Sequence, residues 1–236
     1  MKSERKTARK DDVRQMFDSI APKYDFLNHF LSLGIDRLWR RKAIKIIEKH
    51  EHGKILDIAT GTGDMAILAS KLKPEMIAGV DISSEMINFQ QKKLAKRKLE
   101  HLIKPRVADG ENIPFDADTF DIVMTAFGVR NFENLEKGLD EMHRVLNDNG
   151  MAVILEFSSP RKSPFKQLYN FYFTKILPRV GKVISKDMQA YTYLPDSVST
   201  FPSGNDFIQI LKDAGFKNTK CISLTFGIAS IYVGKK

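Results

Sequence analysis

A glycine-rich turn is the first feature of the sequence that has the chemistry of a ligand site. It follows the apolar run Lys54–Ala59 and contains Gly61 and Gly63. Glycine at these two positions lets the backbone turn sharply and lets a ligand approach it closely. The spacing G-x-G-x-x-A also suits a dinucleotide, so the surrounding residues must identify the ligand.

Three acids occupy consecutive expected strands around this turn. Asp57 lies inside the first strand, where a buried carboxylate can accept hydrogen bonds from loop amides or, through water, from a cationic ligand. Asp81 ends the second strand and can accept both hydroxyls of a ribose. Asp109, followed by Gly110, ends the third strand and can accept from an adenine amino group. Because Asp64 would repel a pyrophosphate, this set favours the cationic sulfonium of S-adenosylmethionine over a dinucleotide. The alternative is that these acids only stabilise turns or cap helices. That role would explain a single acid more readily than three at consecutive strands.

The elements that must position these residues alternate between strands and helices. We expect strands at 54–59, 76–81, 103–108, 120–127 and 150–157, and helices at 64–73, 84–98 and 135–146, with Ser84 as an N-cap. Such alternation predicts an α/β protein with a parallel, doubly wound sheet. Two more strands, 217–225 and 228–233, are separated only by Phe226 and Gly227. So short a connection permits only an antiparallel pair at the end of the sheet.

Two segments fall outside this alternation. Residues 13–49 have helical spacing with a break at Pro22, which predicts an N-terminal helical cap over 1–53. The domain that binds the cofactor then covers 54–236. Within it, about 158–203 is an aromatic and basic insertion with helical spacing in Phe165–Leu177. We expect this insertion to form a lid over the substrate, or else a helix packed on the sheet.

The net charge of +9 is spread unevenly, with basic flanks around an acidic block at 55–159. A basic excess favours an anionic partner, such as nucleic acid or a lipid surface, although a solvated surface explains it equally well. The single Cys221 excludes an internal disulfide, and we expect it in the core. The sequence shows no secretory signal and no apolar run near the ~18 residues of a membrane span. We therefore expect a cytoplasmic protein, or one held peripherally at a membrane surface.

Several motifs beyond the glycine turn resemble those of one known family. They are Tyr24–Ser32 with Trp39, Phe127–Asn131, Arg144–Leu146, Glu156–Ser158 and Tyr191–Ser197. The resemblance runs from about Val13 to Val233 and is to the UbiE/MenG C-methyltransferases of menaquinone and ubiquinone biosynthesis. It implies a Rossmann-like class I methyltransferase with a seven-stranded sheet. It also implies methylation of a ring carbon of a polyprenylated hydroquinone, with demethylmenaquinol ahead of a ubiquinone precursor or another lipophilic molecule.

The resemblance places cofactor contacts at Thr62, Asp81, Asp109 and Gly110. Three places depart from the family pattern. Ala126 stands where some members have a serine, which removes one cofactor contact. Asp36 replaces the usual His or Gln before the Trp, and Asn147–Asn149 replaces a Lys-Pro-Gly turn. The last two departures do not touch the expected chemistry.

Carbon methylation of a hydroquinone requires one ionised phenol, which pushes charge to the neighbouring ring carbon. We assign Arg130 to favour the phenolate by its charge and Asn131 to orient it, since both follow the fourth strand at the carboxyl edge of the sheet. A surface salt bridge is the alternative role of Arg130. The base that removes the ring hydrogen is left open among Tyr191, Tyr193 and a water held by Asp109.

The inserted segment could grip an isoprenoid tail while its flanking basic residues contact anionic lipid; these are Arg161, Lys162, Lys166, Lys175, Arg179, Lys182 and Lys186. An RNA methyltransferase is a rival that the basic flanks favour, but no Asn-Pro-Pro-Tyr or Asp-Pro-Pro-Tyr motif is present. The acids and the terminal hairpin disfavour a nicotinamide-dependent oxidoreductase, and the intact cofactor residues disfavour a non-catalytic scaffold. We expect no metal and no nucleic acid, and leave a homodimer open.

Overall fold

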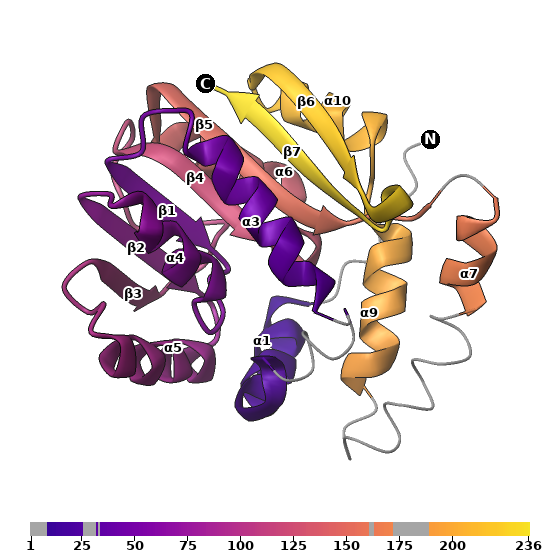
Figure 1. The fold of residues 1–236 in the computed structure, drawn as a ribbon, viewed down its shortest axis with the longest axis horizontal. Helices are drawn as coiled ribbons and strands as arrows, with labels where there is room; N and C mark the ends of the chain where they lie inside the picture. The colour runs from indigo at the N-terminus through magenta and orange to yellow at the C-terminus, as the bar shows by residue number, and fades with distance from the viewer. Residues whose placement is uncertain (1–8, 26–31, 33, 161–162, 172–188) are drawn as a thin grey trace.

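The computed structural model describes residues 9–25, 32, 34–160, 163–171 and 189–236 of the chain (Figure 1). Its centre is a seven-stranded sheet in the order β3-β2-β1-β4-β5-β7-β6. The pairs among β1 to β5 are parallel, whereas β7 is antiparallel to β5 and to β6. This confirms the predicted parallel sheet that ends in an antiparallel hairpin. The strands are β1 Lys54–Ile58, β2 Met76–Asp81, β3 Ile103–Val107, β4 Phe120–Ala126, β5 Leu146–Phe157, β6 Lys217–Leu224 and β7 Ala229–Lys235.

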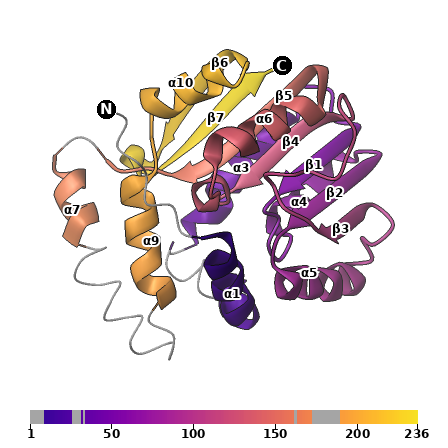
Figure 2. The same ribbon diagram turned by 180° about the vertical axis from the view of Figure 1, so that it is seen from behind.

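Helices cover both faces of the sheet. Figure 1 shows α3 and α4 in front, and Figure 2 brings α6 and α10 forward on the opposite face. The helices are α1 Lys10–Ile20, α3 Ile35–Ile47, α4 Asp64–Ala69, α5 Ser84–Arg97, α6 Leu135–Val145, α7 Phe165–Phe171, α9 Gln189–Thr200 and α10 Asn205–Asp213. Short 3₁₀ turns are η1 Ala21–Lys23, η2 Ser70–Leu72, η3 Val129–Asn131 and η5 Thr225–Gly227.

The alternation of side chains along the central strands explains the two covered faces. In β1, Ile55 packs into the cluster that contains Trp39 of α3, while Leu56 packs into the cluster that contains Leu139 of α6. Apolar residues therefore point to both sides of the strand, as is typical of parallel sheets buried on both faces. With its faces sealed, the sheet leaves the carboxyl ends of its strands as the place for polar loops.

Three local predictions need correction, and one helix was not predicted. The N-cap of α5 is Ser83, not Ser84, because the Oγ of Ser83 accepts from the amide of Met86 at 3.1 Å. Strand β5 begins at Leu146, ahead of the expected start, because it pairs with Phe120 beside a register shift. Helix α9 was not expected, and it contains Pro195. Cys221 is exposed, not in the core, because β6 is the outer strand of the sheet.

The segments that frame the strand ends come from distant parts of the chain. Helix α1 packs against α5 and α9 at the end of the sheet where β1 to β4 finish (Figure 1). The expected helix 165–177 is described as α7 to Phe171, and its remainder lies outside the described residues. Among the described residues, no helix has the combined length and apolar character needed to cross a bilayer.

Candidate active site

A cavity lies where the loops after β1, β2, β3 and β4 meet helix α1. Of the residues that the sequence predicted for the site, Gly61, Asp81, Asp109, Gly110 and Asn131 line this cavity. The structure therefore brings together residues from four separate loops. The predicted Asp57, Thr62, Gly63, Arg130 and Tyr193 lie outside the lining and hold neighbouring positions.

Asp81 at the end of β2 is held by two backbone amides. Its Oδ2 accepts from the amide of Gly61 at 2.8 Å, and its Oδ1 accepts from the amide of Ser83 at 2.9 Å. Burial raises the pKa of Asp81 to about 6, against these hydrogen bonds, which lower it. The carboxylate is thus ionised at neutral pH and fixed at the cavity wall, where it can accept ligand hydroxyls.

Asp109 after β3 is already paired with the N-terminal cap. Its Oδ2 lies 2.6 Å from the Nζ of Lys10, and its Oδ1 accepts from the amide of Glu111 at 2.9 Å. Lys10 also lies 3.3 Å from Glu111. The pKa of Lys10 is raised, since these hydrogen bonds and charges outweigh its burial. An adenine amino group at this place would share Asp109 with Lys10.

Asp57 supports the glycine turn from behind. It is fully buried, and its Oδ2 accepts from the Oγ1 of Thr60 at 2.7 Å. Burial raises its pKa to about 7. Thr60 in turn accepts from Gln90 at 3.2 Å, and a Cβ at Gly63 would lie only 2.7 Å from the Cγ of Gln90. Asp57, Thr60 and Gln90 together hold the shape of the glycine turn. Asp57 therefore supports the site from behind the turn and does not line the cavity.

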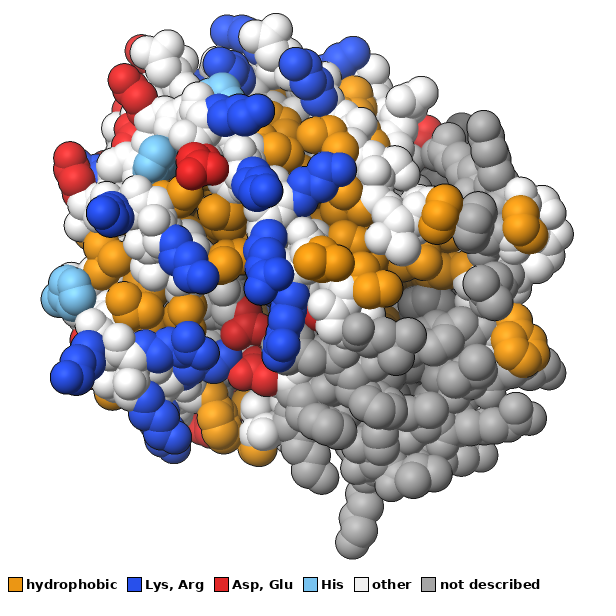
Figure 3. Space-filling view, in the orientation of Figure 1, with side chains coloured by type: hydrophobic (Ala, Val, Ile, Leu, Met, Phe, Trp, Pro, Cys, Tyr) orange, Lys and Arg blue, Asp and Glu red, His pale blue; other side chains and the backbone are white. Residues whose placement is uncertain are grey.

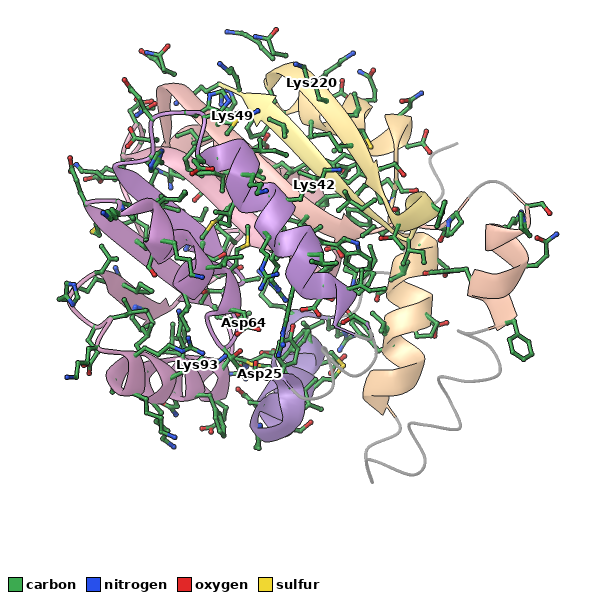
Figure 4. The ribbon with its side chains drawn as sticks, viewed as in Figure 1. Asp25, Lys42, Lys49, Asp64, Lys93 and Lys220 are labelled. Carbon is green, nitrogen blue, oxygen red and sulfur yellow. The ribbon has the colours of Figure 1, made fainter. Side chains whose placement is uncertain are left out.

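The N-terminal cap grips the glycine turn through a cluster that we name the clasp, made of Asp25, Thr62, Asp64 and Lys93. The Nζ of Lys93 lies 2.6 Å from Asp25 and 2.8 Å from Asp64. The hydroxyl of Thr62 donates to Asp25. Figure 4 shows Asp25, from the segment after η1, converging with Asp64 of α4 and Lys93 of α5. The clasp thus joins three elements around the residue that the family resemblance named, Thr62.

Two more contacts tie the cap to the other strand ends. The Oγ of Ser83, after β2, donates to Asp18 of α1 at 2.6 Å. Lys10 pairs with Asp109 after β3, as described above. The cap therefore touches each of the three loops that carry the acids. Lys10 and Asp18 were not predicted as site residues, because no local pattern reveals contacts between segments so far apart in the chain. Asp25 lies in the motif Tyr24–Ser32, but its contact with Lys93 was not predicted.

Lys93→Met is expected to weaken cofactor binding about fivefold to tenfold, since a partly exposed ion pair contributes about 1 kcal/mol. The loss arises because Asp25 and Asp64 would repel each other without the cation between them. Isothermal titration calorimetry with S-adenosylhomocysteine measures it. Lys92→Met, at the exposed neighbouring position, is the matched control. Equal affinities of the two variants would show that the clasp does not support the site.

On the substrate side, Arg130 and Glu156 form a buried ion pair. The Nη1 of Arg130 lies 2.9 Å from Glu156, which is fully buried, and it also donates to the carbonyl of Phe127. The guanidinium lies over the ring of Phe157 at 5.5 Å. Burial raises the pKa of Glu156 against the opposing charge of Arg130. The arginine is therefore oriented from three sides and is no surface salt bridge, because its side chain is only 7% exposed.

Asn131 lines the cavity next to this pair. The hydroxyl of Tyr193, on α9, donates to its Oδ1 at 2.9 Å, while its Nδ2 donates to the carbonyl of Phe127 at 3.3 Å. Burial raises the pKa of Tyr193, so the phenol is protonated at neutral pH. Tyr193 thus fixes the amide of Asn131 and brings the inserted segment to the site. The side chain of Tyr191 lies outside the described residues.

The charge of the cavity matches a cation. Among its described lining residues are three acids, Asp81, Asp109 and Glu111, against one basic residue, Lys10. This net negative wall, the glycine turn and the terminal antiparallel hairpin together define a class: the protein is an S-adenosylmethionine-dependent methyltransferase. The cavity's acids suit the sulfonium and hydroxyls of that cofactor and would repel the phosphates of a dinucleotide.

Comparisons with known proteins place the chain within this class. Residues 3–236 match the model of the ubiE/COQ5 methyltransferase family, and the chain belongs to that family. It is 50% identical over 232 residues to the ubiquinone/menaquinone biosynthesis C-methyltransferase UbiE of Geotalea uraniireducens (strain Rf4), covering 98% of each chain. It is 46% identical to the demethylmenaquinone methyltransferase of Bacteroides fragilis (strain ATCC 25285), covering 96% of this chain and 93% of that one.

Solved structures support the fold. A SAM-dependent methyltransferase from Thermotoga maritima superposes with a TM-score of 0.64 at 18% identity, over 94% of this chain and 99% of the other. One from Aquifex aeolicus gives 0.59 at 20% identity, over 83% and 88%. Both likenesses concern the fold. With the family, they confirm the predicted methyltransferase fold, enzyme class and cofactor, and they set aside the nicotinamide-dependent oxidoreductase.

Proposed function

We propose that the enzyme methylates a ring carbon of a polyprenylated hydroquinone, converting demethylmenaquinol to menaquinol. The observation that carries this proposal is the relationship over nearly the full chain to a demethylmenaquinone methyltransferase. The name of the Geotalea relative includes ubiquinone as well, so a ubiquinone precursor is the second candidate substrate. Both substrates present an electron-rich hydroquinone ring to the site, fused to a second ring in demethylmenaquinol and single in the ubiquinone precursor.

S-adenosylmethionine supplies the electrophilic methyl group when it is bound. In this proposal Asp81 accepts hydrogen bonds from the ribose hydroxyls, and Asp109 accepts from the adenine amino group. Thr62 and the glycines Gly61, Gly63 and Gly110 shape the cavity around the cofactor. Asp57 acts indirectly, because it accepts the hydrogen bond that holds Thr60 in the turn.

Arg130 and Asn131 act on the quinol. Arg130 favours the ionised phenol by its charge, and its Nε is buried without a hydrogen-bond partner among the described residues. Asn131 orients the ring from the cavity wall. Tyr193 fixes Asn131 through its hydroxyl, and because its pKa is raised it is better suited to donate a proton than to act as the base.

We also propose that the enzyme works in the cytoplasm at the inner face of the membrane, because an isoprenoid tail keeps the substrate in the bilayer. The inserted segment 158–203 would cover that tail. Helix α9 supports this placement, since it lies within the segment and reaches Asn131 through Tyr193.

Incubation with methyl-labelled S-adenosylmethionine tests the proposal. We expect label on the quinone ring when reduced demethylmenaquinone is supplied, and less with a reduced ubiquinone precursor. Mass spectrometry of the extracted quinones locates the methyl group. Label appearing only in an added RNA, or in no quinol at all, would contradict the proposed substrate.

A further inference from the structure

The outward face of α3 carries a dense row of cations. Arg37, Arg41, Lys42 and Lys45 of the helix are all exposed, as is Lys49 just after it. Figure 3 shows a ridge of blue side chains across the middle of this face. Lys220 extends it on the edge strand β6, and Figure 4 shows Lys42, Lys49 and Lys220 on the same side of the molecule. We call these six residues the α3 basic face.

This charge is not neutralised locally. Among the described residues, none of the six side chains forms an ion pair with an acid. The one acid within α3, Asp36, is buried and faces Arg40 at 3.5 Å. Glu48 is the exposed acid within this stretch. A row of unpaired cations repels itself, and an anionic partner would relieve that repulsion.

Two large apolar side chains flank the basic face at one end. Leu38 of α3 is 58% exposed, and Phe226 of the β6–β7 turn is 67% exposed. A hydrogen bond of 2.8 Å from the indole of Trp39 to Thr225 fixes that turn beside α3. A surface that binds lipid typically combines cations with exposed apolar groups. The cations contact the lipid headgroups, and the apolar groups insert below them.

We infer that the α3 basic face docks the enzyme on an anionic lipid bilayer. The partner is lipid in preference to RNA because an aliphatic side chain such as Leu38 contributes nothing to base stacking but adds apolar area in a bilayer. This surface differs from the inserted segment, whose basic residues are the sequence-based candidates for contact with anionic lipid.

Docking by this face orients the active site. The amino-terminal end of α3, which carries Leu38, points toward α9, and the β6–β7 turn lies beside α9 in both views (Figures 1 and 2). Helix α9 in turn reaches the cavity residue Asn131 through Tyr193. The membrane would therefore meet the molecule on the side where a quinol enters. The benefit of this orientation rests on the proposed function, because it assumes a quinol substrate in the membrane. The docking itself is argued from the charges and does not need that assumption.

Flotation with vesicles of phosphatidylglycerol and phosphatidylcholine tests the inference. We expect the wild-type enzyme to float with these vesicles at low salt and not with pure phosphatidylcholine. The triple variant Lys42→Gln, Lys45→Gln, Lys49→Gln should bind roughly 100-fold more weakly, the fold-change for three basic residues removed from an anionic surface. The matched control Lys92→Gln, Lys96→Gln, Arg97→Gln removes equal charge from exposed positions of α5 and should bind like the wild type.

Equal loss in both triple variants would overturn the inference, because net charge and not this face would then govern binding. Unchanged binding of the α3 variant would overturn it as well, and so would tighter binding of duplex RNA than of vesicles at the same salt. Turnover of a short-tailed demethylmenaquinol in detergent separates the two proposals. The α3 variant should keep the wild-type rate there, and absent turnover in the wild type would instead sink the proposed function.

Discussion

Asp81→Asn is expected to weaken binding of S-adenosylhomocysteine by about 100-fold to 1,000-fold, which corresponds to roughly 3 to 4 kcal/mol. The carboxylate is fixed by the amides of Gly61 and Ser83, so it needs no rearrangement to accept two ligand hydroxyls. An amide offers one acceptor in place of two and brings a donor that would face the donating amides. Calorimetric titration measures the loss.

The pH dependence of binding provides a second, independent signature of Asp81. Because burial raises its pKa to about 6, the ionised form that accepts the hydroxyls is depleted as the pH falls through 6. Cofactor affinity should therefore decline about tenfold per pH unit below that value in the wild type. Asp81→Asn has no proton to gain at this position and should lack this transition.

Folding stability separates this effect from damage to the fold. A carboxyl whose pKa is raised in the folded state binds more protons there than in the unfolded chain, so it costs stability as the pH rises from about 4 to 6. Asp81→Asn removes this cost but turns a donor toward one of the two backbone amides that Asp81 accepts from, so the two effects oppose each other and the melting temperature at pH 7 should stay close to that of the wild type. If the variant unfolds at a much lower temperature, or if it binds the cofactor as well as the wild type, Asp81 does not have the role proposed.

The parts of the site that the sequence predicted are those set by local rules. Gly61, with a φ of 57°, needs the left-handed conformation that glycine adopts freely. Asp81 ends the apolar run of β2 and Asp109 follows β3, and parallel strands bring their carboxyl ends to one edge of the sheet. Fold and acids could therefore be inferred together.

The missed parts depend on contacts across the chain. Lys10 meets Asp109 over a separation of 99 residues, and neither residue has a neighbour that signals the other. The charge of Glu156 matters because it is buried against Arg130, yet its strand sequence gives no hint of that partner. Helix α9 was obscured by Pro195, which argues against a helix when only local propensity is considered.

Arg130→Met is expected to lower kcat by about 100-fold to 1,000-fold, the range observed when one donor that stabilises developing anionic charge is removed. Cofactor affinity should stay near the wild-type value, because Arg130 does not line the cavity. Single-turnover assays with reduced demethylmenaquinone measure the rate, and calorimetry with S-adenosylhomocysteine measures the affinity. The lower kcat is expected because the phenol would lose the cation that favours its ionised form.

The buried partner of Arg130 makes a single variant ambiguous, because Glu156 would be left charged and unpaired. Breaking such a pair costs about 3 to 5 kcal/mol of stability, whereas replacing both partners by neutral groups of similar volume is often nearly neutral. Arg130→Met should therefore melt well below the wild type, while Arg130→Met with Glu156→Gln should recover most of the lost stability. The two roles of Arg130 predict different activities for this double variant. If the cation acts on the quinol, the double variant is stable and remains slow; if Arg130 serves only to neutralise Glu156, its turnover returns with its stability.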